Sequence, residues 1–227
     1  MDALPPSGLA ACIEHTLLRP EAVRVDFERL CAEATQFRFH AVCVMGSRVT
    51  LVKTLLDGSD VKVVAAVGFP LGNADSDAKR YETEVAVDHG ADEIDVVINP
   101  AWLKEGARSL VLRELRDVVE AADDRPVKVI LETCLLSDAE KVEACALIRE
   151  SGAKFVKTST GFGRAGATVE DVRLLREAVG PAFGVKASGG IRDLALARAL
   201  LDAGADRLGT SHGVAIMREA LAAQPQN

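Results

Sequence analysis

The feature that most constrains this chain is an alternation of short apolar runs with helical patterns, repeated eight times. The runs are rich in β-branched residues, and each is long enough for one buried strand. They lie near residues 12–16, 41–44, 61–67, 93–98, 127–132, 155–159, 184–188 and 207–210. The segments between them are long enough for helical crossovers, which parallel strands require. The alternation predicts an α/β protein with a parallel sheet.

Helix boundary signals fall between these runs. Ser137 to Glu140 forms a capping box, and Thr168 to Asp171 forms a weaker version of one. Glycines stand where the helices should end and can adopt the left-handed conformation that closes a helix. These glycines are Gly58, Gly90, Gly152, Gly180 and Gly204.

A short internal repeat indicates that the strand–helix units are alike. His89–Asp92, Ser151–Lys154 and Ala203–Asp206 each carry Gly-Ala just before a strand run, and their glycines are 62 and 52 residues apart. Each interval fits two strand–helix units. Eight units in 227 residues, 48% of them hydrophobic, favour a (β/α)8 TIM barrel over an open sheet. We expect a single domain over residues 1–227, with loose tails at about 1–8 and 222–227.

Two lysines lie inside predicted strands. Lys157 is in the run 155–159 and Lys186 is in the run 184–188, so neighbouring strands carry them. A buried ammonium group must be paired or lose its proton. One such lysine alone could equally form an ion pair with an Asp or Glu that fills a layer of the barrel interior. Two adjacent cations repel, however, which favours a neutral amine on one of them and indicates Schiff-base chemistry.

Further charged residues lie in the fourth and fifth runs. Asp95 is in the fourth run, and Lys128 and Glu132 share one parity in the fifth. Side chains alternate along a strand, and we expect the charged parity to point into the barrel. Asp95 would then lie near both lysines.

A glycine-rich segment follows the seventh run. Ser188-Gly189-Gly190-Ile191-Arg192 stands there, and Gly209-Thr210-Ser211 ends the eighth run. Barrels commonly bind phosphate at the loops after these two strands, where backbone N–H groups are accessible. A tight turn alone would also explain Gly189-Gly190, but the location at both strands favours a phosphate site.

The chain closely resembles the deoxyribose-phosphate aldolases, the class I aldolases of deoxynucleoside breakdown, over nearly its whole length. The order of the Asp95 and two lysine motifs is the most specific part of this resemblance. The similar segments are Glu14–Pro20, Ala41–Val44, Val67–Gly72, Glu93–Asn99, Lys128–Thr133, Phe155–Phe162, Lys186–Arg192 and Arg207–Ser211.

The resemblance implies reversible cleavage of 2-deoxy-D-ribose 5-phosphate to D-glyceraldehyde 3-phosphate and acetaldehyde. It implies Lys157 as the Schiff-base lysine, Lys186 as the residue that lowers its pKa, and Asp95 as the acid that relays protons. No metal or cofactor is implied. The resemblance also places a further set near the substrate or its phosphate: Thr16, Cys43, Thr158, Gly161, Gly189, Gly190, Arg192 and Ser211. For Cys43, the residue type alone favours a small buried core residue.

Three positions depart from the family pattern. Glu14 replaces a usual aspartate in the first strand, His212 replaces a serine, and the last residues lack the tyrosine that some members use in proton transfer. The first two departures affect expected contacts with substrate hydroxyls and phosphate. The third leaves that proton-transfer role absent or filled by water.

Two other functions remain open from the residues. One is a noncatalytic barrel that binds phosphosugars, in which the lysines only hold an anion. The other is a Schiff-base aldolase for a different phosphorylated sugar. Asp95 argues against the first, because a pure anion site gains nothing from a carboxylate.

Composition narrows the partners and the compartment. The net charge of −7 argues against nucleic acid or an anionic membrane as a partner. Five cysteines without a CxxC pair, and four histidines without metal-binding spacing, argue against disulfides and metal sites. No signal peptide or long apolar stretch is evident. We expect a cytoplasmic enzyme, with a homodimer left open.

Overall fold

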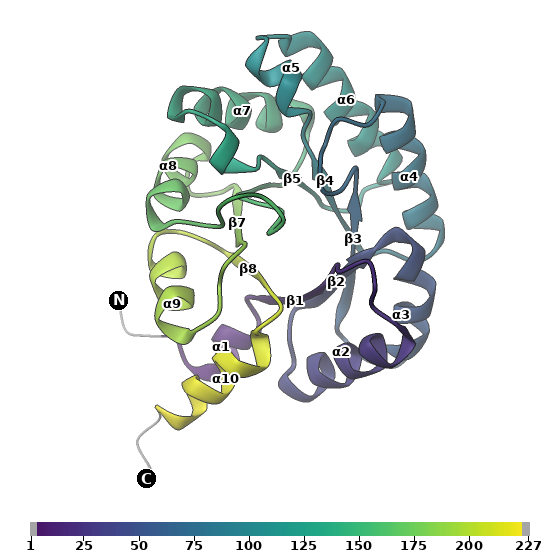
Figure 1. Ribbon diagram of the computed structural model, residues 1–227, viewed down its shortest axis with the longest axis vertical. Coiled ribbons are helices and arrows are strands. Elements are labelled where there is room, and N and C mark those ends of the chain that lie inside the picture. The colour runs from purple at the N-terminus through teal and green to yellow at the C-terminus, as the bar shows by residue number, and fades with distance from the viewer. Residues whose placement is uncertain (1–3, 224–227) are drawn as a thin grey trace.

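The computed structural model describes residues 4–223 and contains a closed barrel of eight parallel strands (Figure 1). The strands pair in chain order, and β8 pairs with β1. They are β1 (Ile13–Leu17), β2 (Ala41–Met45), β3 (Lys62–Val67), β4 (Glu93–Val97), β5 (Val127–Ile130), β6 (Phe155–Lys157), β7 (Gly184–Ser188) and β8 (Arg207–Thr210). Each matches a predicted run to within two residues at either end, so the predicted (β/α)8 barrel is confirmed.

Helices surround the barrel, as Figure 1 shows. The described helices are α1 (Pro6–Ala10), α2 (Arg24–Phe37), α3 (Val49–Leu55), α4 (Ser76–Asp88), α5 (Pro100–Lys104), α6 (Arg108–Ala121), α7 (Asp138–Ser151), α8 (Val169–Val179), α9 (Leu194–Asp202) and α10 (Gly213–Ala222). Two short 3₁₀ turns, η1 (Gly46–Arg48) and η2 (Thr133–Leu135), follow β2 and β5. Helix α1 packs against α10.

The predicted helix boundaries hold. The Ser137 hydroxyl accepts a hydrogen bond from the Glu140 amide, and the Glu140 carboxylate accepts one from the Ser137 amide, which completes the capping box of α7. Thr168 caps α8 in the simpler way, by accepting from the Asp171 amide. All five predicted helix-ending glycines have positive φ angles. At Gly152, with φ 93°, the left-handed conformation turns the chain from α7 toward β6.

The predicted N-terminal tail is too long. Pro6 to Gly8 belong to α1, whose Leu9 and Ala10 are buried. Proline suits the first turn of a helix because its missing N–H would have no helical partner there. The apolar side chains of α1 then pack against α10. Residues 1–3 and 224–227 of the predicted tails lie outside the described residues.

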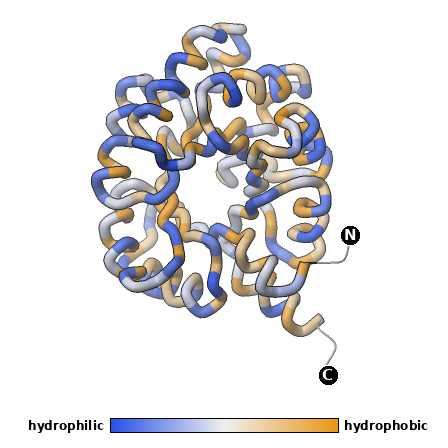
Figure 2. Tube along the Cα trace, turned by 180° about the vertical axis from the view of Figure 1, so that it is seen from behind, coloured by the Kyte–Doolittle hydropathy of each residue, from blue (hydrophilic) through white to orange (hydrophobic). Residues whose placement is uncertain are grey.

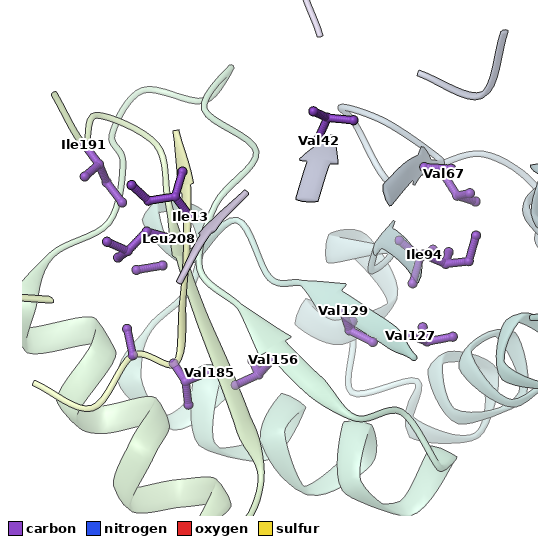
Figure 3. Close-up of a cluster of buried hydrophobic side chains, with 14 of the residues drawn as sticks. Ile13, Val42, Val67, Ile94, Val127, Val129, Val156, Val185, Ile191 and Leu208 are labelled. Carbon is purple, nitrogen blue, oxygen red and sulfur yellow. The ribbon is translucent and has the colours of Figure 1, made fainter. Parts of the chain in front are cut away.

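Two apolar layers result from the alternation of side chains along the strands. The larger layer lies between barrel and helices, and Val129, Val156 and Val185 in Figure 3 belong to it. Figure 2 shows hydrophilic and hydrophobic residues alternating along the covering helices, as one-sided burial requires. The opposite strand parity faces the barrel interior, where Cys43 and Val64 form part of a small apolar cluster. The same interior also contains buried charged side chains.

Candidate active site

Asp95 lies at the centre of the barrel interior and holds three lysines. Its Oδ2 atom is 2.8 Å from Lys157 Nζ and 2.6 Å from Lys186 Nζ, while Oδ1 is 2.9 Å from Lys128 Nζ. All four side chains are buried. The structure therefore brings together the three residues that the sequence singled out for catalysis, and it adds Lys128.

Strand register explains this assembly. Lys157 on β6 and Lys186 on β7 are direct partners, and Asp95 on β4 is the partner of Lys128 on β5. Side chains at paired positions share one face of the sheet, so all four point into the barrel. The predicted inward parity of the charged residues is correct for them. Glu132 instead lies beyond the end of β5, because its φ of 54° is incompatible with an extended strand. Its carboxylate accepts a hydrogen bond from the Thr160 amide at 3.3 Å.

Two more carboxylates complete the group. Glu14 contacts Lys186, and Glu93 Oε2 is 2.6 Å from Lys128 Nζ. We call the six residues Glu14, Glu93, Asp95, Lys128, Lys157 and Lys186 the inner charge cluster. It contains three potential cations and three potential anions. Glu14 is fully buried and forms an ion pair with Lys186.

Electrostatics keeps most of the cluster ionised. Burial alone would raise the pKa of Asp95, but the surrounding lysines outweigh it and hold the pKa well below its usual range. Burial likewise disfavours the charge of Lys186, yet Asp95 and Glu14 outweigh it and raise the pKa of Lys186. The same balance raises the pKa of Lys128. Lys186 therefore stays protonated and places a positive charge beside Lys157.

A cavity of about 290 Å³ opens at the C-terminal ends of the strands. Among the described residues, Lys157 is the one member of the inner charge cluster that lines it. Six of the eight residues expected near the substrate line it as well, namely Thr16, Gly161, Gly189, Gly190, Arg192 and Ser211. The amine of Lys157 thus has Asp95 on one side and open space on the other.

The glycine segment after β7 forms one wall of this cavity. Gly189 and Gly190 have φ angles of 90° and 76°, which other residues rarely adopt. A Cβ atom on Gly189 would lie 3.0 Å from the Cα of Gly166, so the β6–α8 loop packs closely on this turn. Ser211 and His212 stand beside it at the start of α10, and the two side chains lie 3.1 Å apart.

Two expected substrate residues lie away from the cavity wall. Thr158 is fully buried; its hydroxyl donates to the Ser188 carbonyl at 3.1 Å and accepts from the Ser188 amide at 3.0 Å. It therefore ties β6 to β7. Cys43 belongs to the apolar interior cluster, with its sulfur 4.0 Å from Asp95 Oδ2. Burial raises the pKa of its thiol to about 11. This agrees with the expectation that Cys43 is a small buried core residue.

Several wall residues were not singled out from the sequence. Arg19 lies just after β1, and Thr160 and Phe162 lie in the loop after β6. Arg19 could have been found, because it follows a strand whose C-terminal end faces the site. Phe162 could not, because its position depends on how the loop folds onto Phe69, whose ring meets it edge to face at 5.3 Å.

The described residues offer one geometric candidate for a metal site. Oxygen and nitrogen atoms of Glu14, His40 and Glu93 lie within 4.8 Å of one another. The ammonium group of Lys128 already contacts Glu93 and lies 3.6 Å from Glu14 Oε1. Because it supplies the positive charge that these carboxylates require, the group is better explained as an ion-pair network. In the part of the chain described here, no helix is long and apolar enough to span a membrane.

Comparison with known proteins agrees with this architecture. The family model described as DeoC/LacD family aldolase matches residues 12–223. Deoxyribose-phosphate aldolase of Alkaliphilus oremlandii is 51% identical over 213 residues, which cover 93% of this chain and 96% of that protein. The protein of the same name from Thermococcus gammatolerans is 51% identical over 216 residues, with the same two coverages. A deoxyribose phosphate aldolase structure from Aeropyrum pernix has a TM-score of 0.89 at 35% identity, covering 96% of this chain and 93% of that one. The chain belongs to the DeoC/LacD family of aldolases.

Proposed function

We propose that this aldolase catalyses the reversible cleavage of 2-deoxy-D-ribose 5-phosphate to D-glyceraldehyde 3-phosphate and acetaldehyde through a Schiff base on Lys157. One observation carries the assignment of the lysine: Lys157 shares an Asp95 oxygen with the cationic Lys186 and also reaches the cavity. The names of the relatives reported above support the substrate.

The first half of the reaction builds an electron sink. The neutral Lys157 amine attacks the aldehyde carbon of the open-chain sugar and forms a carbinolamine. Protonation of the carbinolamine hydroxyl lets it leave as water, and a cationic iminium group remains. Asp95, in contact with both Lys157 and Lys186, is placed to receive and return the protons that these steps move. General acid–base assistance of this kind typically contributes about 10²- to 10⁴-fold.

The second half breaks the carbon–carbon bond. The C3 hydroxyl loses its proton, and its oxygen forms the carbonyl of D-glyceraldehyde 3-phosphate. The C2–C3 bonding electrons move to the iminium, which becomes a neutral enamine on Lys157. Protonation of the enamine at C2 restores an iminium, and hydrolysis then releases acetaldehyde and regenerates the amine.

The phosphate would bind at the glycine wall of the cavity. Gly189 and Gly190 bring backbone close to the open space, and the ten-residue helix α10 begins beside Ser211. Helix N-termini and exposed amides favour anions. Arg192 and Arg19 line the same cavity and add positive charge to it. Phosphate binding here would position the sugar, while the chemistry takes place at Lys157.

Borohydride trapping tests the proposal. Incubation with acetaldehyde and borohydride should add one ethyl group to Lys157, located by peptide mass spectrometry. Lys157→Leu should lose both the adduct and turnover, while Lys154→Leu, an exposed lysine before β6, should keep both. Phosphate binding without any adduct would instead support the noncatalytic phosphosugar-binding barrel. An adduct without cleavage of 2-deoxyribose 5-phosphate would support an aldolase for another phosphorylated sugar.

Assembly and compartment remain predictions. The Aeropyrum pernix structure is described as tetrameric, whereas a homodimer is the assembly that we consider for this chain from its sequence. The cytoplasm remains the compartment that the sequence predicts.

A further inference from the structure

His40 joins the inner charge cluster from the end of the barrel opposite to the cavity. It directly precedes β2, and its Nε2 atom lies 3.1 Å from Glu93 Oε1. The chain of contacts continues from Glu93 to Lys128, from Lys128 to Asp95 and from Asp95 to Lys157, each at 2.6–2.9 Å. The His40 side chain is 15% exposed, so this group connects solvent with the buried cluster.

The charges of the cluster balance only while Lys157 is protonated. Three ammonium groups then face the three carboxylates of Glu14, Glu93 and Asp95. Schiff-base formation needs the neutral amine, and its formation leaves the cluster with one negative charge in excess. In a buried environment, such an excess favours the return of a proton to Lys157. A further positive charge on the cluster would offset this tendency.

The carboxylates that face His40 would stabilise a positive charge on its ring. Glu93 lies in hydrogen-bond contact with the ring, and a Glu14 oxygen is within 4.8 Å of a ring nitrogen. Glu14 Oε1 is buried and accepts no hydrogen bond from any described residue. Two cations lie on the same side: Lys128, which already contacts both carboxylates, and the half-exposed Lys62, 3.6 Å from Glu93 Oε1. An imidazolium here would donate to Glu93 and lie near the Glu14 oxygen that accepts no hydrogen bond from the described part of the chain.

We infer that His40 is a positioning residue for the amine chemistry: its imidazolium supplies the positive charge that the cluster loses when Lys157 becomes neutral. This inference rests on the proposed Schiff-base role of Lys157. His40 does not line the cavity, and its ring contacts Glu93 rather than Lys157. It acts through Glu93, Lys128 and Asp95, and its effect is on the pH at which Lys157 reacts.

The chain contains a matched control. His15 is buried and, like His40, pairs with a glutamate, with Nε2 2.8 Å from Glu33 Oε2. Its ring packs on Phe39, with the centroids 5.2 Å apart, outside the inner charge cluster. His15→Gln and His40→Gln each remove one histidine–glutamate pair, so an effect that arises only from losing such a pair should appear in both variants. Only the second change removes a charge that is connected to Lys157.

The test is the pH dependence of acetaldehyde trapping on Lys157 in the full chain, read by peptide mass spectrometry. In His40→Gln, the pH midpoint of adduct formation should rise by roughly half to one pH unit, a charge effect expected across several buried contacts. Adduct formation below the midpoint should fall about 3- to 10-fold. His40→Lys should restore the midpoint, and His15→Gln should leave it unchanged.

Glu93→Gln provides a second variant with the opposite sign. It removes one negative charge from the cluster, so its midpoint should fall below that of the wild type. Equal midpoints in wild type and His40→Gln, or the same rise in His15→Gln, would overturn the inference while leaving the Schiff base intact. No Lys157 adduct in the wild type at any pH would overturn the proposed function itself.

Discussion

At the scale of single residues, burial does not by itself identify a catalytic lysine. Lys79 is as buried as Lys186, and burial lowers its pKa against the attraction of Glu114. Its Nζ atom is 2.9 Å from Glu114 Oε1 and 2.9 Å from the Val97 carbonyl, and it does not line the cavity. Lys157 differs because it combines a carboxylate partner, a cationic neighbour and access to the cavity.

Loss of Lys186 should change the pH dependence of the reaction. Without this cation, Lys157 holds its proton more strongly, because one nearby charge typically moves a pKa by about one to three units. In Lys186→Leu, we expect the acid limb of kcat/KM to move to higher pH by that amount. The rate at neutral pH should fall about 100-fold or more. Circular dichroism would check the fold, and a wild-type pH profile would contradict the assigned role.

Cys43 should react slowly with alkylating reagents. Its thiol is fully buried, and its pKa of about 11 leaves little thiolate near neutral pH. Cys134, which is only partly buried, provides the internal comparison. Iodoacetamide should label Cys134 well before Cys43, as measured by peptide mass spectrometry over time. Faster labelling of Cys43 would mean that the interior opens readily.

At the scale of elements, the sequence was most informative where a local rule acts alone. The eight strands, the capping box at Ser137 and the glycine ends of helices follow from patterning and backbone chemistry, and all were predicted. The meeting of Asp95, Lys157 and Lys186 was predicted because strand parity and order fix which side chains lie together. The exit of Glu132 from β5 and the wall position of Phe162 depend on loop packing, which neighbouring residues do not encode.

The ion pair between helices α4 and α6 was also beyond sequence patterns. Lys79 and Glu114 lie 35 residues apart, and each is fully buried. Removing one partner leaves an uncompensated buried charge, so Lys79→Met should lower the free energy of unfolding by about 3–5 kcal/mol. Urea denaturation would measure this loss. The double variant Lys79→Met/Glu114→Leu should recover most of it, and equal losses in both variants would contradict an ion-pair origin.

At the scale of the whole molecule, the charged interior makes stability depend on pH. The lysines hold the pKa of Asp95 low, and His40 and Lys128 overcome burial to do the same for Glu93. Folded-state pKa values below the unfolded values of about 3.9 and 4.3 mean that folding favours the ionised carboxylates. Their stabilisation is fully present above these unfolded values and is lost as the pH falls toward the folded values.

We therefore expect the free energy of unfolding to fall steeply below about pH 4.5. Each carboxylate whose pKa is depressed by folding contributes stability at neutral pH that acidification removes. Urea midpoints measured between pH 7 and pH 3 would follow the loss. Asp138 is an exposed control, because its Lys141 partner also pairs with Asp171. Asp138→Asn should leave the curve unchanged, whereas a flat wild-type curve would contradict the expected linkage.

The closed barrel also has a topological consequence. Pairing of β8 with β1 means that none of the eight described strands forms an edge, and the contact between α1 and α10 brings the first and last described helices together. Because the strands form a closed ring, the chain could begin at a different strand and still give each strand the same two neighbours. A circular permutant that links α10 to α1 and opens the turn at Gly58, where an added Cβ would meet no atom within 4 Å, should retain every strand neighbour.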